Sequence, residues 1–241
     1  MARFSFHAAR TTRRYGASNR DHPGVIRHAL APVSASAAAA LDIPRTITTH
    51  GPGVALTFDD GPHPEGTPAV LEALARANAR ATFFVVGEQV QRRPALVAEI
   101  AAAGHTVALH GYRHRLQLRL GGRDVRADIE RGLESIREAA GIDASWHRPP
   151  YGVYSPAGLK FVRQAGLHPL LWSRWGKDWR KFTTPSRIAS RATREIGSGD
   201  VILLHDGDFY SARDSHRRTV QALKTILSRL SHAGLDTVLP D

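Results

Sequence analysis

Cysteine is absent from this chain of 241 residues. Disulfide bonds, thiolate metal ligands and a cysteine nucleophile are therefore excluded. Any bound metal must be held by histidine, aspartate or glutamate side chains. Because 42% of the residues are hydrophobic, the chain is long enough to form one large domain with a real core, or at most two small ones.

Long apolar segments are also missing. No run of 18 apolar residues occurs, so no transmembrane helix is predicted. An arginine pair in "TTRRYGAS" and the small residues of "VSASAAAAL" are features of an export signal, but no clear hydrophobic segment lies between them. We interpret residues 1–45 as a flexible or loosely packed extension, with a degenerate export signal as the alternative. Residues 46–241 are predicted to form the functional domain.

Acidic residues are scarce relative to basic ones. The chain has 22 Asp and Glu against 33 Lys and Arg, which gives a formal net charge of +11 at pH 7. This excess reflects either a general preference for arginine in the composition or attraction to an anionic polymer. The arginines are scattered and do not alternate with aromatic residues as they do in single-strand binders, so no nucleic-acid partner is expected.

From residue 54 onward, short apolar runs alternate with helical segments. The apolar runs cover residues 54–58, 81–86, 106–110, 144–147, 168–172, 201–205 and 236–239. They are mostly continuous, which favours strands buried on both faces of a parallel sheet. Helix starts are predicted where a capping residue precedes proline, at Thr67-Pro68, Ser155-Pro156 and Thr184-Pro185.

Seven strand–helix units in this order predict an α/β fold. The first strand is not followed by a glycine-rich phosphate loop, which argues against a dinucleotide-binding open sheet. The units span about 185 residues, fewer than the roughly 250 of an eight-unit barrel. A distorted (β/α) barrel with about seven parallel strands fits best.

Polar side chains gather just beyond the C-terminal ends of these strands. Asp59 and Asp60 follow the first strand, His110 and His114 follow the third, and His205 ends the sixth. Parallel strands of a barrel place their C-terminal ends on one face, where active sites form. The H-x3-H spacing would put two imidazoles on one side of a helical turn, although one such spacing can arise by chance among 13 histidines.

Two histidines and an aspartate would form a metal site with open positions for water. This arrangement also gives a reason for the adjacent aspartates. One of them can bind the cation while the other faces the bound water, and the cation relieves the repulsion between them. A plain Asp-Asp-Gly-Pro turn is the alternative interpretation.

Five motifs in register resemble the polysaccharide deacetylases, the chitooligosaccharide deacetylase homology domain of the carbohydrate esterases. The motifs are "TFDDGP", "HGYRH", "RPPYG", "DW" and "LLHD", and the resemblance covers about residues 53 to 239. It implies removal of N-acetyl or O-acetyl groups from sugar polymers with a divalent metal, for which zinc is expected. The metal ligands that it implies are Asp60, His110 and His114.

The resemblance also implies roles for the other motif residues. The catalytic set would be Asp59 as general base, Arg148 as its ion-pair partner, the Tyr151 backbone N–H in the oxyanion hole, His205 as general acid and Asp178 as the carboxylate that tunes it. Leu203 would line the pocket for the acetyl methyl group. Trp175 and Trp179 would offer a surface for a sugar ring, with ordinary packing of the strand–helix junction as the alternative.

Two positions depart from the family pattern. Gly111 stands where the family often has Ser or Thr, so a hydroxyl that would brace the loop is missing. Trp175 takes the place of the first of two aspartates. The carboxylate that tunes His205 is therefore either lost or supplied by Asp178. Asp206 either orients His205 or begins a loop. His63 is expected on the surface, with a contact to substrate as the alternative.

The predicted function is N-deacetylation of a glycan such as peptidoglycan or a chitin-like polymer. An O-acetyl esterase acting on xylan-type polymers is the near alternative, because the same groups can cleave esters. A non-catalytic binder of acidic polymers is the alternative from another class, but it would have no use for Asp59. The resemblance favours the cell envelope or secretion, and a monomer is expected.

Overall fold

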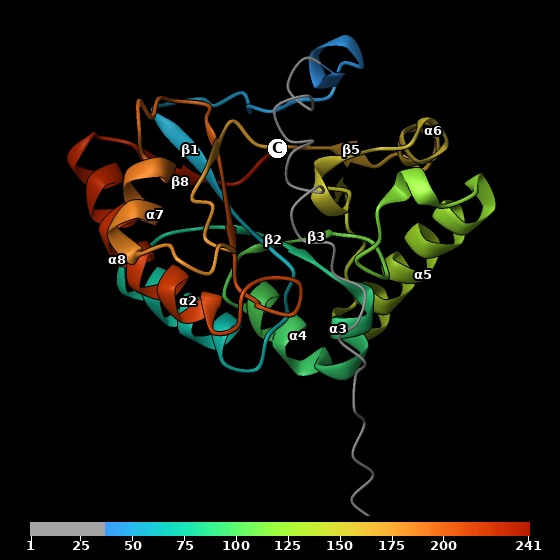
Figure 1. Ribbon diagram of the computed structural model, residues 1–241, viewed down its shortest axis with the longest axis horizontal. Helices are drawn as coiled ribbons and strands as arrows, with labels where there is room; N and C mark the ends of the chain where they lie inside the picture. Colours follow the sequence, from blue (N-terminus) through green and yellow to red (C-terminus); the bar gives the residue numbers. More distant parts are fainter. Residues whose placement is uncertain (1–36) are drawn as a thin grey trace, which may run out of the picture.

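The computed structural model describes residues 37–241, and its centre is a curled parallel sheet surrounded by helices (Figure 1). From one edge to the other, the sheet runs β5 (His168–Pro169), β4 (Trp146–His147), β3 (Thr106–Leu109), β2 (Thr82–Val85), β1 (Gly53–Asp59), β7 (Val201–His205) and β6 (Arg174–Trp175). A further strand, β8 (Asp236–Val238), pairs with the first half of β1. Each ladder between these strands is parallel, which confirms the distorted (β/α) barrel.

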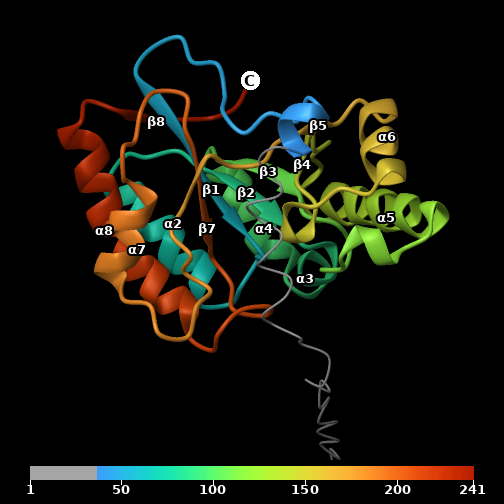
Figure 2. The same ribbon diagram turned by 45° about the horizontal axis from the view of Figure 1, so that its top comes forward.

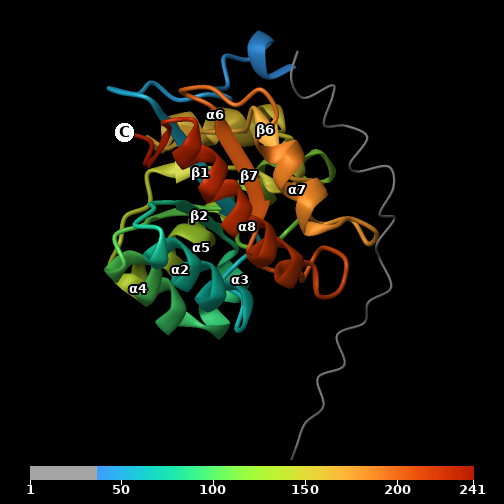
Figure 3. The same cartoon turned by 90° about the vertical axis from the view of Figure 1, so that its left-hand side faces the viewer.

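The helices lie on the outside of this sheet. They are α2 (Gly66–Arg76), α3 (Gly87–Arg92), α4 (Pro94–Ala102), α5 (Gly122–Ala140), α6 (Pro156–Gln164), α7 (Pro185–Ala192) and α8 (Ser215–His232). In the side view, α7 and α8 run next to each other over β7 (Figure 3). Ser155 and Thr184 cap α6 and α7 as predicted, each accepting a backbone N–H three residues on. Within residues 37–241, none of the helices has the length and apolar character to span a bilayer.

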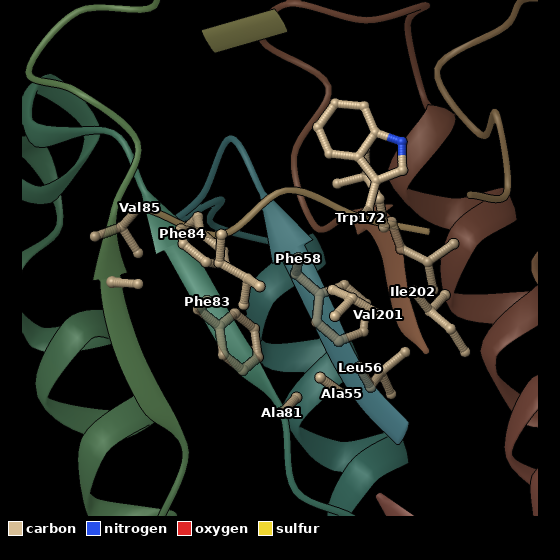
Figure 4. Close-up of a cluster of buried hydrophobic side chains, with 14 of the residues drawn as sticks. Ala55, Leu56, Phe58, Ala81, Phe83, Phe84, Val85, Trp172, Val201 and Ile202 are labelled. Atoms are coloured by element: carbon tan, nitrogen blue, oxygen red, sulfur yellow. The ribbon is translucent and has the colours of Figure 1, made fainter. Parts of the chain in front are cut away.

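The core is built from buried side chains of the strands, chiefly β1, β2, β3 and β7, and of the helices packed around them. All seven residues of β1 are buried, which explains why its sequence does not alternate between polar and apolar residues. The ring of Phe58 stacks on that of Phe83, with centroids 5.2 Å apart (Figure 4). Burial of each such ring stabilises the fold by about 1.5–3 kcal/mol. This packing fixes the strands whose ends carry the candidate site.

The predicted strand 168–172 is shorter in the structure. It ends at Pro169 because the carbonyls of Leu170 and Leu171 accept hydrogen bonds from the Arg148 guanidinium, at 2.9 and 3.0 Å, rather than from another strand. The chain re-enters the sheet only at β6. Among the described residues no ladder joins β5 to β6, so the barrel is open between them.

Residues 38–47 run across this open edge, from the side of β5 and β4 to the turn before β7 (Figure 2). Ala38 and Ile43 are buried, the Leu171 N–H donates to the Pro44 carbonyl at 2.9 Å, and the Ile47 N–H donates to the Gly199 carbonyl at 2.9 Å. In the described part of the predicted flexible or loosely packed extension, residues 37–45, these two buried side chains and the Pro44 carbonyl therefore contact the domain, while most of the other side chains are exposed. The remainder of that prediction, residues 1–36, lies outside the described residues.

Candidate active site

One pocket at the C-terminal ends of the strands contains most of the predicted site. The predicted residues that line it are Asp59, Asp60, His110, His114, Tyr151, Trp175, Trp179, Leu203 and His205. Arg148 and Asp178 lie behind the pocket wall and are completely buried. The structure thus brings together residues from five separate segments of the chain, as the five motifs predicted.

The candidate metal centre consists of Asp60, His110 and His114. The His114 Nε2 lies 3.3 Å and the His110 Nε2 3.7 Å from the Asp60 Oδ1. Ligand atoms about 2.1 Å from a tetrahedral zinc ion would be about 3.4 Å apart, so these distances suit a shared cation. Asp60 directs its carboxylate here from a left-handed backbone conformation with φ of 81°, a region that aspartate tolerates better than most residues.

Two further observations indicate that these side chains fit a cation. The Asp60 Oδ1 is buried and has no hydrogen-bond partner among residues 37–241. The His110 Nδ1 lies 2.8 Å from the Arg148 carbonyl, which can only accept a hydrogen bond, so the proton is on Nδ1 and the Nε2 lone pair faces Asp60. Burial, together with the positive charge of Arg148, lowers the pKa of His110 to about 3, which keeps the imidazole in its ligand form.

Asp60 has a raised pKa in the absence of a cation. Burial and the nearby Asp59 and Asp206 carboxylates raise it to about 7, while His205 acts in the opposite direction. A divalent ion would supply the positive charge that this cluster of carboxylates lacks. Two imidazole nitrogens with one carboxylate oxygen form a donor set suited to zinc and related ions.

Asp59 is held by Arg148. The guanidinium donates to the Asp59 Oδ1 at 2.7 Å and to the Thr57 hydroxyl at 2.9 Å, in addition to the two carbonyls described above. Its carbon atom also lies 3.9 Å from the centre of the Phe84 ring. Burial raises the pKa of Asp59, and the Arg148 charge offsets part of this rise. The second oxygen of Asp59 lies 3.7 Å from the His110 Nε2, so this carboxylate faces the candidate metal centre.

His205 is the register partner of Asp59 on the neighbouring strand β7. Its Nδ1 lies 2.8 Å from the Asp178 Oδ1, and its backbone N–H donates to the Asp178 Oδ2 at 2.8 Å. Thr219 adds a hydrogen bond to the same carboxylate. Burial alone would lower the pKa of His205, but Asp178, with smaller contributions from Asp60 and Asp59, raises it to about 10.

Asp178 therefore occupies the position of the tuning carboxylate, although Trp175 replaces the first aspartate of that motif. Asp206 does not orient His205. Its carboxylate instead accepts a hydrogen bond from the Thr67 hydroxyl, beneath the first turn of α2. The helix α2 begins at Gly66, two residues before the predicted start at Pro68, so Thr67 lies inside the helix and the prediction that it caps α2 was wrong.

The histidine pair is brought together by a loop rather than by the helical turn that we expected. His110 follows β3, and Gly111 then adopts a left-handed conformation with φ of 82°. Asp128 of α5 accepts the backbone N–H groups of Tyr112 at 2.8 Å and Arg113 at 3.1 Å. This carboxylate braces the loop in place of the missing hydroxyl. Sequence reasoning missed Asp128 because it belongs to none of the motifs.

Aromatic side chains form the remaining wall of the pocket. The Trp175 and Trp179 rings lie 5.3 Å apart between centroids, and Trp179 meets His205 edge to face at 5.6 Å. Leu203 lies at the base of the pocket and is 3% exposed. Tyr210, which sequence reasoning also missed, stacks on His114 with ring centroids 4.1 Å apart.

A second cluster, formed by His63, Asp208 and His216, has metal-like spacing but does not fit a cation. The His63 Nδ1 accepts the backbone N–H groups of Glu65 at 3.2 Å and Gly66 at 2.9 Å. The proton of this neutral imidazole is therefore on Nε2, which faces the Asp208 Oδ1 at 3.2 Å as a donor. His63 is 7% exposed, so the prediction of a surface position was wrong, and its ring caps the start of α2.

The chain resembles known proteins over most of its length. Residues 46–170 match the family described as polysaccharide deacetylase. A chitooligosaccharide deacetylase from Sinorhizobium fredii is 37% identical over 203 residues, which cover 80% of this chain and 94% of the relative. A peptidoglycan-N-acetylglucosamine deacetylase from Bacillus cereus is 35% identical over 183 residues, covering 75% of this chain and 83% of the relative.

A solved structure has the same fold as this chain. The crystal structure of the Bc1960 peptidoglycan N-acetylglucosamine deacetylase superposes with a TM-score of 0.77 at 29% sequence identity, covering 83% of this chain and 92% of that one. The fold and the pocket define a hydrolase of the (β/α)-barrel carbohydrate esterases. The chain belongs to the polysaccharide deacetylase family, and the two relatives described above are named as deacetylases of N-acetylated sugars.

Proposed function

We propose that residues 46–241 form a metal-dependent catalytic domain that removes N-acetyl groups from a glycan of the peptidoglycan or chitin type. Asp60, His110 and His114 would hold the divalent ion, and zinc is the metal that this donor set favours. One observation carries the proposal. The triad, the Asp59–Arg148 pair and the His205–Asp178 pair all lie at the same pocket. The names of the relatives described above support the acetylated glycan as substrate.

The reaction needs a stronger nucleophile than free water and a more electrophilic carbonyl. A divalent ion held by Asp60, His110 and His114 would acidify a water molecule and polarise the acetamide carbonyl. Asp59 takes the proton of the attacking water, and its raised pKa makes it a stronger base than an exposed aspartate. Arg148 fixes the direction of this carboxylate. We assign the Tyr151 backbone N–H to the developing oxyanion, a contact that is worth about 3 kcal/mol in such sites.

The sugar amine must be protonated as it leaves. His205 serves as the acid because Asp178 keeps its imidazole charged at neutral pH. The Nδ1 proton is donated to Asp178, so the proton available to the amine is the one on Nε2. Leu203 contacts the acetyl methyl group, and Trp175 and Trp179 support the sugar ring on the side of His205.

Acetate release from defined substrates tests the proposal. The zinc-loaded chain is incubated with chito-oligosaccharides, peptidoglycan and acetylated xylan, with and without a chelator. We expect acetate from an N-acetylated substrate, loss of release with chelator and recovery on addition of zinc. Asp59→Asn and His205→Ala should each reduce release by at least about 100-fold, the usual size of a general acid or base contribution.

The outcomes separate the alternatives. Release from the acetylated xylan alone would favour the O-acetyl esterase. Glycan binding that survives both substitutions, without release from any substrate by the wild-type protein, would favour the non-catalytic binder. Absence of release from every acetylated glycan by zinc-loaded protein would contradict the proposed function.

A further inference from the structure

Tyr210 lies on the loop between β7 and α8, outside the five motifs and outside residues 46–170, which match the family. It lines the pocket, and its ring is nearly parallel to the His114 imidazole, with centroids 4.1 Å apart and an interplanar angle of 9°. Tyr151 meets the same imidazole edge-on at 4.6 Å. Two aromatic rings from distant parts of the chain thus contact one candidate metal ligand.

The Tyr210 ring is itself anchored at its far end. Its hydroxyl donates to the Glu88 Oε1 at 2.8 Å and accepts from the Gln89 Nε2 at 3.2 Å. Both residues lie in the first turn of α3, and the Glu88 N–H donates to the Tyr112 carbonyl in the loop that carries His114. Tyr210 therefore joins the loop after the acid histidine to the loop of the metal ligand.

We propose that Tyr210 is a positioning residue that holds the His114 imidazole in the orientation needed to bind the cation. This inference rests on the metal site of the proposed function. Parallel rings at this separation are in van der Waals contact, so rotation of the imidazole about its Cβ–Cγ bond would drive ring atoms into Tyr210. The tyrosine restricts His114 to the rotamer whose Nε2 faces Asp60.

Metal binding by the full chain tests this role. The chelator-treated protein is titrated with Co²⁺, whose visible absorption reports ligand geometry, and with Zn²⁺ against a chromophoric chelator. Tyr210→Ala should weaken affinity by about 10–100-fold, the range found for groups that orient a ligand, and should alter the cobalt spectrum. Tyr210→Phe keeps the stacked ring and should restore most of the affinity.

Phe209→Ala is the matched control. Phe209 precedes Tyr210 on the same loop and packs against His63 at 4.9 Å and the Arg93 guanidinium at 5.1 Å. It meets the Tyr210 ring edge-on, with centroids 6.3 Å apart, whereas Tyr210 is the ring that stacks on His114. Its truncation should lower the melting temperature and leave metal affinity unchanged. Equal affinity of Tyr210→Ala and wild type, an equal loss in Phe209→Ala, or no rescue by Tyr210→Phe would overturn the inference. A wild-type chain that binds neither metal would remove the proposed metal site as well.

Discussion

At the scale of single residues, Arg148 does most to hold the site in place. One fully buried guanidinium contacts the Asp59 carboxylate, the Thr57 hydroxyl and two carbonyls of the segment that replaces the predicted strand. Removing it would leave Asp59 buried and unpaired. Arg148→Met should therefore lower the free energy of unfolding by about 3–5 kcal/mol, measured by urea denaturation.

An exposed arginine provides the comparison. Arg126 pairs with Glu130 at 2.8 Å on the surface of α5, and Arg126→Met should change the unfolding free energy by less than about 1 kcal/mol. Arg148→Met combined with Asp59→Asn should recover part of the loss, because the unpaired charge is gone. A double variant as unstable as the sum of the single variants would show that the pair is not coupled.

The His205–Asp178 pair predicts a pH dependence. The pKa of His205 is about 10 in the folded chain, above its ordinary value of 6.5. The stability that the pair contributes is therefore complete below pH 6.5 and is lost as the pH rises through the folded pKa. In Asp178→Asn, unfolding free energy should fall less between pH 7 and pH 10 than in wild type.

Asp178→Asn should also move the alkaline limb of the pH profile of kcat to lower pH, because His205, the proposed acid, would lose its proton more readily. Thr219→Val removes only the hydroxyl that bonds to Asp178 and should cause a smaller shift in the same direction. An alkaline limb that stays in place in Asp178→Asn would argue against His205 as the acid, or against its tuning by this carboxylate.

The sequence predicts the position of some side chains of the site and not of others. Asp59, Asp60, His110 and His205 follow apolar runs, so the geometry of parallel strands was enough to place them on one face. Asp128 and Tyr210 lie in a helix and in a long loop, where no strand end fixes their direction. Only the folded chain shows that they reach the histidine loop.

At the scale of elements, the loop from His110 to His114 depends on α5. Asp128 accepts two of its backbone N–H groups, so Asp128→Ala should loosen the loop and weaken zinc binding by about 10–100-fold. Chelator competition measures this affinity. Asp124→Ala, in the first turn of the same helix, controls for the loss of an acidic side chain and should bind zinc as wild type does.

The start of α2 offers a second test at this scale. His63 accepts two backbone N–H groups there, and His63→Ala should lower the unfolding free energy by about 1 kcal/mol, the usual size of a cap. Asn at this position can also cap a helix and should recover part of the loss. An unchanged unfolding free energy in His63→Ala would contradict the capping role.

Elements with strong local signals were predictable, and those shaped by distant contacts were not. The runs 54–58 and 201–205 are strands because their residues are buried on both faces. The run 168–172 has a similar composition, but its carbonyls bond to a guanidinium from another segment. The sequence of residues 168–172 does not show that the Arg148 guanidinium will take these carbonyls in place of a neighbouring strand.

At the scale of the whole molecule, the cation is expected to contribute to stability. An ion that binds the folded chain at 100 times its dissociation constant stabilises it by about 2.7 kcal/mol. Zinc should therefore raise the melting temperature of chelator-treated wild-type protein in a concentration-dependent manner. His110→Ala, which lacks a ligand, should show little shift, and an equal shift in that variant would place the stabilising ion elsewhere.

The pairing of Asp59 with His205 across β1 and β7 has a consequence for how this scaffold can change. Neighbouring strands lie about 4.8 Å apart, so the separation between the proposed proton acceptor and the proposed proton donor is set by main-chain geometry before any sugar arrives. Rim positions that carry none of the proposed metal, base, acid or positioning groups can be exchanged without disturbing that separation. A library that varies only those positions should alter which polymer is accepted while the chemical step survives.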